Sequence, residues 1–202
     1  MKIVLATSNK GKLFEFQERC QFQEGEHPGL EFIPQSSLCI TDAEETESTF
    51  LENALLKARH AAKESGMPAL ADDSGLCVPA LGGAPGVYSA RYAGTGVSAD
   101  NIAKLLGAMK GLSGADRQAY FCCNLVFVLS HNDPNPLVFQ GQWEGIILTA
   151  SHGEGGFGYD PVFYLPQLGK TAAELPLDFK NKISHRGQAL QQFFRNSLGL
   201  SA

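Results

Sequence analysis

The hydrophobic positions in the first third of the chain alternate between strand-like and helix-like patterns. Lys2–Ala6 is a short apolar run that predicts a buried strand, and Leu30–Ile33 alternates as a second strand. Apolar residues recur at helical spacing over residues 13–20 and again along Phe50–Ser65. The pattern therefore indicates strands and helices in alternation, as in an α/β protein.

The helix predicted over Phe50–Ser65 carries clear boundary signals. Thr49 and Glu52 have the spacing of a capping box, and Gly66 and Pro68 follow the last helical residue. We therefore expect this helix to begin and end at these residues. Lys57 lies on a flank of its apolar face, where a lysine is usually solvated.

The second half of the chain predicts a further helix from Ser98, as N-cap, to about Leu112. Tyr120–Ser130 and Leu137–Leu148 predict long strands that return antiparallel around a turn. A basic stretch over residues 178–187 leads into a last helix, at whose start the positive charges oppose the helix dipole. We therefore expect the stretch to serve a ligand rather than helix stability.

The stretch that begins at Ala69 combines a strand with acidic residues. Ala69–Ala71 predicts a short strand that ends at Asp72 and Asp73. Successive strand residues point to opposite faces, so either the strand ends between these carboxylates or they have different roles. A carboxylate pair at a strand end suits a hard cation such as Mg²⁺. A plain turn over Asp72–Gly75 is the alternative, because Asp, Ser and Gly are turn formers.

The loop after the first strand has features of a phosphate site. Thr7–Lys12 leads into a helix, whose first backbone N–H groups and dipole attract anions, and Lys10 and Lys12 add positive charge. The spacing is not that of a Walker loop. Ordinary capping by Ser8 or Asn9 is the alternative interpretation.

Other polar groups could belong to the same site or to ordinary structure. Glu44 and Glu45 either favour a helix dipole or contribute one ligand to the cation. In the glycine-rich loop 153–161, Phe157 and Tyr159 either reach a flat ligand or cover an edge of the core. Both interpretations stay open at this point.

The composition of the chain excludes some classes of function. The chain has 202 residues, enough for one domain, with 44% hydrophobic residues and a net charge of −5. A general nucleic-acid or anionic-membrane binder would need a basic surface, but a small polyanion could still meet a local positive site. The five cysteines show no C-x-x-C spacing, no run reaches transmembrane length, and the first residues are too polar for a signal peptide. We therefore expect reduced thiols and a cytoplasmic protein.

The combination of motifs resembles the inosine/xanthosine triphosphate pyrophosphatase family, also called non-standard purine nucleotide pyrophosphatases. The matching blocks occur in family order and span nearly the whole chain. They are TSNKGK (7–12), EETESTFLENALLKAR (44–59), ADDSGL (71–76), GGAPGVYSARYAG (82–94), GGFGYDP (155–161) and SHRGQAL (184–190).

The resemblance implies a single α/β domain over residues 1–202, with an elongated central mixed β-sheet, flanking helices and two lobes forming a cleft. It implies a homodimer that hydrolyses ITP, dITP and XTP to the monophosphate and pyrophosphate with Mg²⁺, which cleanses the nucleotide pool. No nucleic acid and no membrane is expected as a partner.

The resemblance also implies roles for individual residues. Asp73, Lys12 and Lys57 would be catalytic, and Asp73, Glu45 and Asp72 would hold the metal. The substrate would contact Thr7, Ser8, Asn9, Lys10, Gly11, Lys12, Ser74, Phe157, Gly158, Tyr159, Asp160, Lys180, His185 and Arg186. Of these, Phe157–Asp160, Lys180, His185 and Arg186 would line the base pocket.

These residues support a mechanism in which water attacks the α-phosphorus in line with departing pyrophosphate and Asp73 orients or deprotonates that water. Three alternatives remain: a pyrophosphatase for other modified or pyrimidine triphosphates, a sensor that binds triphosphate without cleaving it, and a redox protein. The cysteine spacing gives little support to the last.

Overall fold

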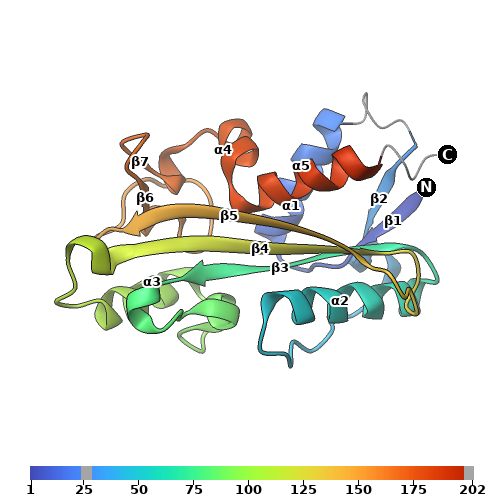
Figure 1. The fold of residues 1–202 in the computed structure, drawn as a ribbon, viewed down its shortest axis with the longest axis horizontal. Coiled ribbons are helices and arrows are strands. Elements are labelled where there is room, and N and C mark those ends of the chain that lie inside the picture. Colours follow the sequence, from blue (N-terminus) through green and yellow to red (C-terminus); the bar gives the residue numbers. More distant parts are fainter. Residues whose placement is uncertain (24–28, 198–202) are drawn as a thin grey trace. The chain divides into compact units, whose positions relative to one another are not determined.

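The computed structural model describes residues 1–23 and 29–197 of the chain. Its strands form one seven-stranded sheet in the order β2-β1-β3-β4-β5-β6-β7 (Figure 1). The strands are β1 (Lys2–Leu5), β2 (Glu31–Pro34), β3 (Ala69–Cys77), β4 (Gln118–Val128), β5 (Leu137–Ile147), β6 (Phe163–Leu165) and β7 (Lys170–Thr171). β1 pairs in parallel with β2 and β3, whereas β6 pairs antiparallel with β5 and β7. The predicted α/β fold with a mixed sheet and flanking helices is confirmed.

The α-helices lie between and after these strands. They are α1 (Lys10–Gln23), α2 (Phe50–Ser65), α3 (Ser98–Ala108), α4 (Leu177–Ile183) and α5 (His185–Ser197). Short 3₁₀ segments accompany them at Gln35–Leu38, Pro79–Leu81, Gly86–Arg91, Gly114–Arg117, Asp160–Val162 and Ala172–Glu174. In the described part of the chain, no helix combines the length and apolar character that crossing a bilayer requires.

The chain divides into two compact units. Unit 1 comprises residues 1–73, 123–141 and 186–202, and unit 2 comprises residues 74–122 and 142–185. Strands β3, β4 and β5 each contribute residues to both units. The unit boundary on β3 falls between Asp73 and Ser74.

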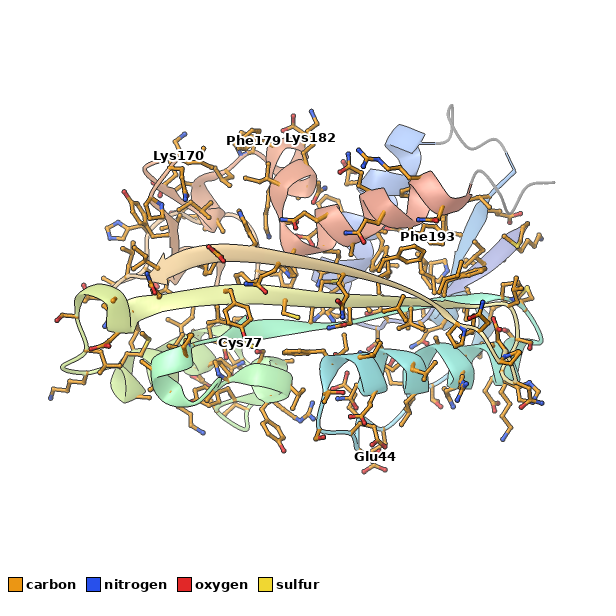
Figure 2. The ribbon with its side chains drawn as sticks, in the orientation of Figure 1. Glu44, Cys77, Lys170, Phe179, Lys182 and Phe193 are labelled. Carbon is orange, nitrogen blue, oxygen red and sulfur yellow. The ribbon has the colours of Figure 1, made fainter. Side chains whose placement is uncertain are left out.

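Unit 1 is built by the two-residue period of its strands. Ile3 and Leu5 face one way and pack with Phe16 of α1 and Phe193 of α5. Val4 faces the other way and packs against the buried alanines of α2. Figure 1 shows α1 and α5 on one side of these strands and α2 on the other, and Phe193 points from α5 toward the sheet in Figure 2. The alternating strand residues thus supply two hydrophobic layers.

Helix α2 begins and ends where its sequence signals predict. Thr49 Oγ1 accepts a hydrogen bond from the Glu52 backbone N–H at 3.2 Å, and its own hydroxyl donates to the Glu52 carboxylate at 2.7 Å. Gly66 takes the left-handed conformation, with a φ of 67°, and its N–H donates to the Ala62 carbonyl. These caps fix the position of Lys57 on the helix.

Unit 2 has its own core around β4, β5 and β6. Phe121, Trp143 and Phe163 pack together there. Leu105 of α3 and Met109, the residue after α3, pack against them. The core is held at its edge by buried Arg117, whose guanidinium donates to four backbone carbonyls, those of Ile147, Met109, Leu112 and Leu148. The arginine closes the ends of α3 and β5 against each other.

The prediction that the strand ends at the acidic pair was wrong. β3 runs from Ala69 to Cys77 and includes all of Asp72–Gly75, so the turn interpretation of these residues is also wrong. The register with β1 covers only the start of β3, Val4 with Ala69 and Leu5 with Leu70, and the strand continues beside β4, its other neighbour in the sheet. This place within the sheet outweighs the turn preference of the local sequence.

Two helix predictions also need correction. α3 begins at Ser98, but Val97 is its N-cap, no side chain caps it, and it ends at Ala108 rather than near Leu112. The basic stretch does not lead directly into one helix, because α4 ends within it. Lys180 and Lys182 therefore lie in the last turn of α4, where positive charge complements the dipole.

Candidate active site

Asp72 and Asp73 lie side by side on β3 and have different partners. Both residues are buried, with 1% and 5% of their surfaces exposed. The strand is regular at this point, so the two side chains point to opposite faces. The sequence left two interpretations open: a strand end between the carboxylates, or different roles for the two. The structure places the two carboxylates in separate environments, which supports different roles.

Asp73 belongs to a charged group with Lys57 and Glu45. Lys57 Nζ donates to Asp73 Oδ1 at 2.9 Å and to Glu45 Oε1 at 2.8 Å. The Lys57 and Asp73 side chains are 12% and 7% exposed, and the Glu45 side chain 26%. Glu44 is exposed and points away from the ribbon in Figure 2. Of the two glutamates considered, the structure thus brings Glu45 to Asp73.

The surroundings of Asp73 and Lys57 shift the pKa values of both side chains. Burial raises the pKa of Asp73 above its usual 3.8, and this outweighs the attraction of Lys57 and Lys12. Burial alone would lower the pKa of Lys57, but the surrounding carboxylates, Asp73 above all, raise it above 10.5. A carboxylate of raised basicity therefore lies beside an ammonium group that keeps its charge.

One oxygen of Asp73 remains available. Among the described residues, Asp73 Oδ2 is buried and accepts no hydrogen bond. Carboxylate oxygens are the ligands that Mg²⁺ prefers, so Asp73 and Glu45 fit a divalent cation. In the described part of the chain, no three or more Asp, Glu, His or Cys side chains are grouped so that they could hold a metal ion together. The structure therefore does not gather Asp72 with the other two predicted metal ligands.

Asp72 belongs instead to a buried ion network. Its Oδ2 accepts from Lys12 Nζ and from Arg186 Nη2, each at 3.1 Å. The Arg186 guanidinium also donates to Glu15, and both of these side chains are almost fully buried. Burial alone would lower the pKa of Arg186, but Asp72 and Glu15 outweigh it and raise that pKa further above its usual range. The network fixes Lys12 and Arg186 in one arrangement.

The loop after β1 leads into α1 through an asparagine cap. Asn9 Oδ1 accepts from the Lys12 backbone N–H at 3.1 Å, and Thr7 Oγ1 accepts from the Asn9 N–H at 3.2 Å. Of the two caps considered, Asn9 is therefore the one observed. Ser8 instead donates its hydroxyl hydrogen to Asp42. Lys10 and Gly11 lie in the first turn of α1, which contains no acidic residue, so its positive end is not neutralised there.

A second group of predicted residues meets within unit 2. Lys180 Nζ lies 2.6 Å from Asp160 Oδ2, and both side chains are buried. The Phe157 backbone N–H donates to the same oxygen at 2.8 Å, and the lysine ammonium lies 4.9 Å from the Phe157 ring centre. The half-buried Gly158 follows Phe157 in the chain. This group places a cation and an aromatic face together.

Gly156 allows the backbone of this loop to pack closely against the Asp160 side chain. At Gly156, where φ is +71°, an added Cβ would lie 2.1 Å from Asp160 Oδ2. A side chain at this position would therefore push the Asp160 carboxylate away from Lys180. The loop needs glycine here for a close internal approach.

Tyr159 and His185 lie in the core of unit 2. Tyr159 is 3% exposed, its hydroxyl donates to the Ser89 carbonyl at 2.9 Å, and burial raises its pKa. His185 stacks on Phe121 with ring centres 4.8 Å apart. Ser74 is half-buried and follows Asp73 on β3. Tyr159 thus occupies the core position considered for it as the alternative to ligand stacking.

Two residues that take part in the contacts around the candidate site, Glu15 and Asp42, were not predicted from the sequence. Glu15 is buried against an arginine 171 positions later, and neither its place in an amphipathic helix nor its neighbours signals that contact. Asp42 lies in the acidic loop and accepts from both Ser8 and Gln35. The acidic composition of residues 41–49 was the only available signal for it.

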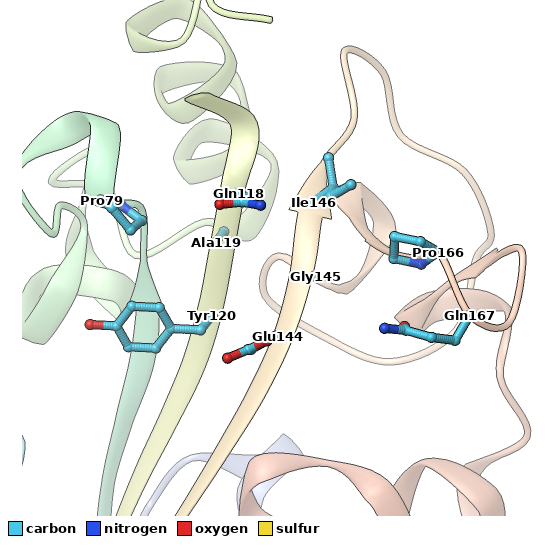
Figure 3. Close-up of a pocket in the computed structure, with 9 residues that line it drawn as sticks. All are labelled: Pro79, Gln118, Ala119, Tyr120, Glu144, Gly145, Ile146, Pro166 and Gln167. Atoms are coloured by element: carbon cyan, nitrogen blue, oxygen red, sulfur yellow. The ribbon is translucent and has the colours of Figure 1, made fainter. Parts of the chain in front are cut away.

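A separate pocket lies in unit 2. It has a volume of about 340 Å³ (Figure 3). Its described lining residues are Pro79, Gln118, Ala119, Tyr120, Glu144, Gly145, Ile146, Pro166 and Gln167. This lining includes none of the residues predicted for the site, so the pocket is not part of it.

Comparisons with known proteins match nearly the whole chain. A model of the Ham1 family matches residues 3–196. A Photorhabdus laumondii protein named dITP/XTP pyrophosphatase is 55% identical over 94% of each chain. A protein of the same name from Coxiella burnetii is 51% identical over 95% of this chain and 94% of its own.

Solved structures agree with the sequence comparisons. A HAM1 protein from Coxiella burnetii matches with a TM-score of 0.88 and 49% identity over 100% of both chains. The Staphylococcus aureus Ham1 protein matches with a TM-score of 0.85 and 41% identity over 98% of this chain and 99% of its own. Both matches cover at least 98% of this chain.

Proposed function

Because this chain belongs to the Ham1 family, we propose that it is a nucleoside triphosphate pyrophosphatase that hydrolyses dITP, XTP and ITP to the monophosphate and pyrophosphate. The names of its relatives support this substrate class. The observation that carries the proposal is the position of Asp73, with one oxygen held by Lys57 and the other buried without a partner among the described residues. That pairing suits a carboxylate that accepts a proton.

Asp73 would act on the attacking water. Lys57 holds Oδ1 and so fixes the carboxylate, which leaves Oδ2 as the atom to take the proton. The raised pKa of Asp73 makes it a stronger base than an ordinary aspartate. General-base assistance of this kind contributes about 10²–10⁴-fold to a rate.

Glu45 and Asp73 would hold Mg²⁺ with the carboxylate oxygens that share Lys57 in the structure, so that Asp73 Oδ2 stays available to the water. When bound, the ion would offset negative charge on the triphosphate. The resemblance predicts Asp72 as a third ligand, but its contacts favour the role of partner to Lys12 and Arg186.

The triphosphate would meet positive groups of unit 1. The first turn of α1 offers backbone N–H groups and the positive end of the helix dipole. Lys12, with 13% of its side chain exposed, and Lys57 add positive charge. Phosphoryl transfer depends mainly on such placement and charge neutralisation.

The purine base would be read by the Lys180 group of unit 2. Hypoxanthine and xanthine carry a 6-oxo group that accepts hydrogen bonds, whereas adenine carries a 6-amino group. The Lys180 ammonium has three N–H donors, and a donor not used by Asp160 would meet an acceptor on a 6-oxo group but none on the 6-amino group of adenine. Sites of this kind can reject the wrong base by about 10⁴-fold.

Arg186, predicted for the base pocket, has contacts that favour another role. Its guanidinium donates to Asp72 and Glu15. We therefore propose that Arg186 holds the Asp72–Lys12 pair in position.

The test is pyrophosphate release by the purified chain from dITP, ITP, XTP, GTP, ATP and dTTP, with and without Mg²⁺. We expect turnover of the first three, with a requirement for Mg²⁺ and weak activity on ATP. Turnover of dTTP or other pyrimidine triphosphates in preference to XTP would favour the related pyrophosphatase. Tight XTP binding without pyrophosphate release would favour a sensor.

Two further properties belong to the same proposal. We propose a homodimer, which light scattering of the purified chain would test. We also propose that the enzyme acts in the cytoplasm, where nucleotides are polymerised, and the free thiols of Cys39, Cys77, Cys122 and Cys123 are compatible with a reducing compartment.

A further inference from the structure

Asp42 connects two segments of unit 1 that carry proposed site residues. One carboxylate oxygen accepts from the Ser8 hydroxyl, in the loop after β1, and the other accepts from the Gln35 side-chain amide. Three residues further along the chain, Glu45 binds Lys57. Asp42 therefore lies where the loop after β1 meets the segment that carries Glu45.

Gln35 is a firm anchor for this contact. Its residue surface is 3% exposed, and it begins the 3₁₀ segment that follows β2. Its carbonyl accepts from the Ile40 N–H at 3.1 Å, which brings the chain back toward Asp42. A buried side chain and a backbone bond thus fix one side of the carboxylate.

The segment that Asp42 holds has no regular structure of its own. Residues 41–47 form neither helix nor strand. Side-chain contacts hold both ends of this segment: His60 Nε2 lies 3.0 Å from the Thr41 carbonyl, and Asn53 exchanges two hydrogen bonds with the Glu47 backbone. Between these ends, Asp42 binds Ser8 and Gln35, and Glu45 binds Lys57.

The Ser8 bond also limits what Ser8 can do. A hydroxyl has one hydrogen to donate. While Asp42 accepts that hydrogen, Ser8 presents only lone pairs to its other neighbours, so it is not a donor to phosphate. The role of Ser8 in this state is to hold Asp42.

We propose that Asp42 is a positioning residue, which joins the loop after β1 to segment 41–47 through Ser8 and Gln35 and thereby sets the place of Glu45. The assignment of a catalytic consequence rests on the proposed function. Because Asp42 is exposed, its contacts contribute little to global stability compared with their effect on this segment.

The first test needs no catalysis. Amide hydrogen exchange in residues 41–47 is measured by mass spectrometry for wild type, Asp42→Ala, Ser8→Ala and the control Asp100→Ala. Asp100 likewise accepts a hydroxyl hydrogen, from Thr95, but in unit 2. We expect faster exchange in Asp42→Ala and, to a smaller extent, in Ser8→Ala, with no change in the control. Unchanged exchange in Asp42→Ala would overturn the proposal.

The second test measures XTP turnover against Mg²⁺ concentration. A small misplacement of site residues can cost about 10²-fold in rate, so Asp42→Ala should lose up to that factor in kcat and need more Mg²⁺ at an unchanged melting temperature. Asp42→Asn keeps one acceptor oxygen, for Ser8, but places an amide NH₂ toward Gln35, so it should lose less than Asp42→Ala. Effects of Asp42→Ala and Ser8→Ala that simply multiply in the double variant would contradict the shared contact.

The two tests separate the claims. If wild type releases no pyrophosphate from XTP or dITP, the proposed function fails, while the exchange result still decides the anchoring role. If wild type is active and Asp42→Ala matches it in kcat and Mg²⁺ requirement, the catalytic consequence is refuted.

Discussion

Asp72 and Asp73 are adjacent in sequence, yet Asp72 pairs with Lys12 and Arg186 while Asp73 pairs with Lys57. The pleat of β3 alone produces this separation. One carboxylate becomes part of a buried ion network, and the other keeps an available oxygen. The two positions should therefore respond differently to the same substitution.

Asp72→Asn and Asp73→Asn form a matched pair for stability. Loss of the Asp72 charge removes the carboxylate partner of Lys12 and leaves Arg186 with Glu15 as its remaining carboxylate partner among the described contacts, so the melting temperature should fall. The ionised form of Asp73 is disfavoured by burial, so Asp73→Asn should not lower the melting temperature. Thermal unfolding at neutral pH measures both, and equal losses would contradict the separate roles.

The raised pKa of Asp73 predicts a pH dependence. Its carboxylate ionises above the usual 3.8, so the acid limb of kcat should lie above that value. The folded state binds this proton more tightly than the unfolded state, so the Asp73 contribution to stability falls as pH rises from 3.8 through the raised value.

Lys57 shows the same direction in a more alkaline pH window. Its contribution is complete below 10.5 and is lost as pH rises through its raised pKa. Rate profiles and melting temperatures across pH test these signs. An acid limb at or below 3.8 would show that Asp73 is not the ionisation that controls the rate.

Glu15→Gln should destabilise the chain strongly. Glu15 is 4% exposed and binds a buried arginine, and removal of one partner of a buried pair costs about 3–5 kcal/mol. Glu31→Gln is the control, because the Lys2–Glu31 pair is 3.7 Å long with both side chains about 60% exposed. Urea unfolding compares them, and similar small effects would show that the Arg186 network is not a major source of stability.

Gly156→Ala and Gly158→Ala separate backbone strain from contact with Asp160. Both glycines have positive φ, +71° and +62°, so both substitutions strain the backbone. Only the Gly156 Cβ would strike Asp160, since nothing lies within 4 Å at Gly158. Gly156→Ala should therefore reduce discrimination between XTP and ATP more than Gly158→Ala does. Equal ratios of kcat/KM in the two variants would remove the Lys180–Asp160 pair from base selection.

Sequence signals predicted correctly those helix ends that depend on contacts between residues close together in the chain. The caps at Thr49 and Gly66 fixed α2 because each satisfies backbone groups of its own helix. The continuation of β3 through Ser74 and Gly75 could not be predicted in this way, because the place of β3 beside β4 in the sheet overrides the turn preference of those residues.

The same division applies to the site. The lysines at positions 12 and 57 and the acidic pair stand out in the sequence by charge and by place relative to strands. The carboxylate partner of each lysine could not be predicted from the sequence, because the partner depends on the direction in which a side chain points from a regular strand. Glu15 depends on a contact from the far end of the chain, which a local pattern does not encode.

The most direct test of the central claim is the turnover number of Asp73→Asn for XTP at saturating Mg²⁺, measured as pyrophosphate release beside wild type. If Asp73 accepts the proton of the attacking water, the variant should remain folded and lose about 10²–10⁴-fold in kcat. A folded variant with turnover close to that of wild type would contradict the account.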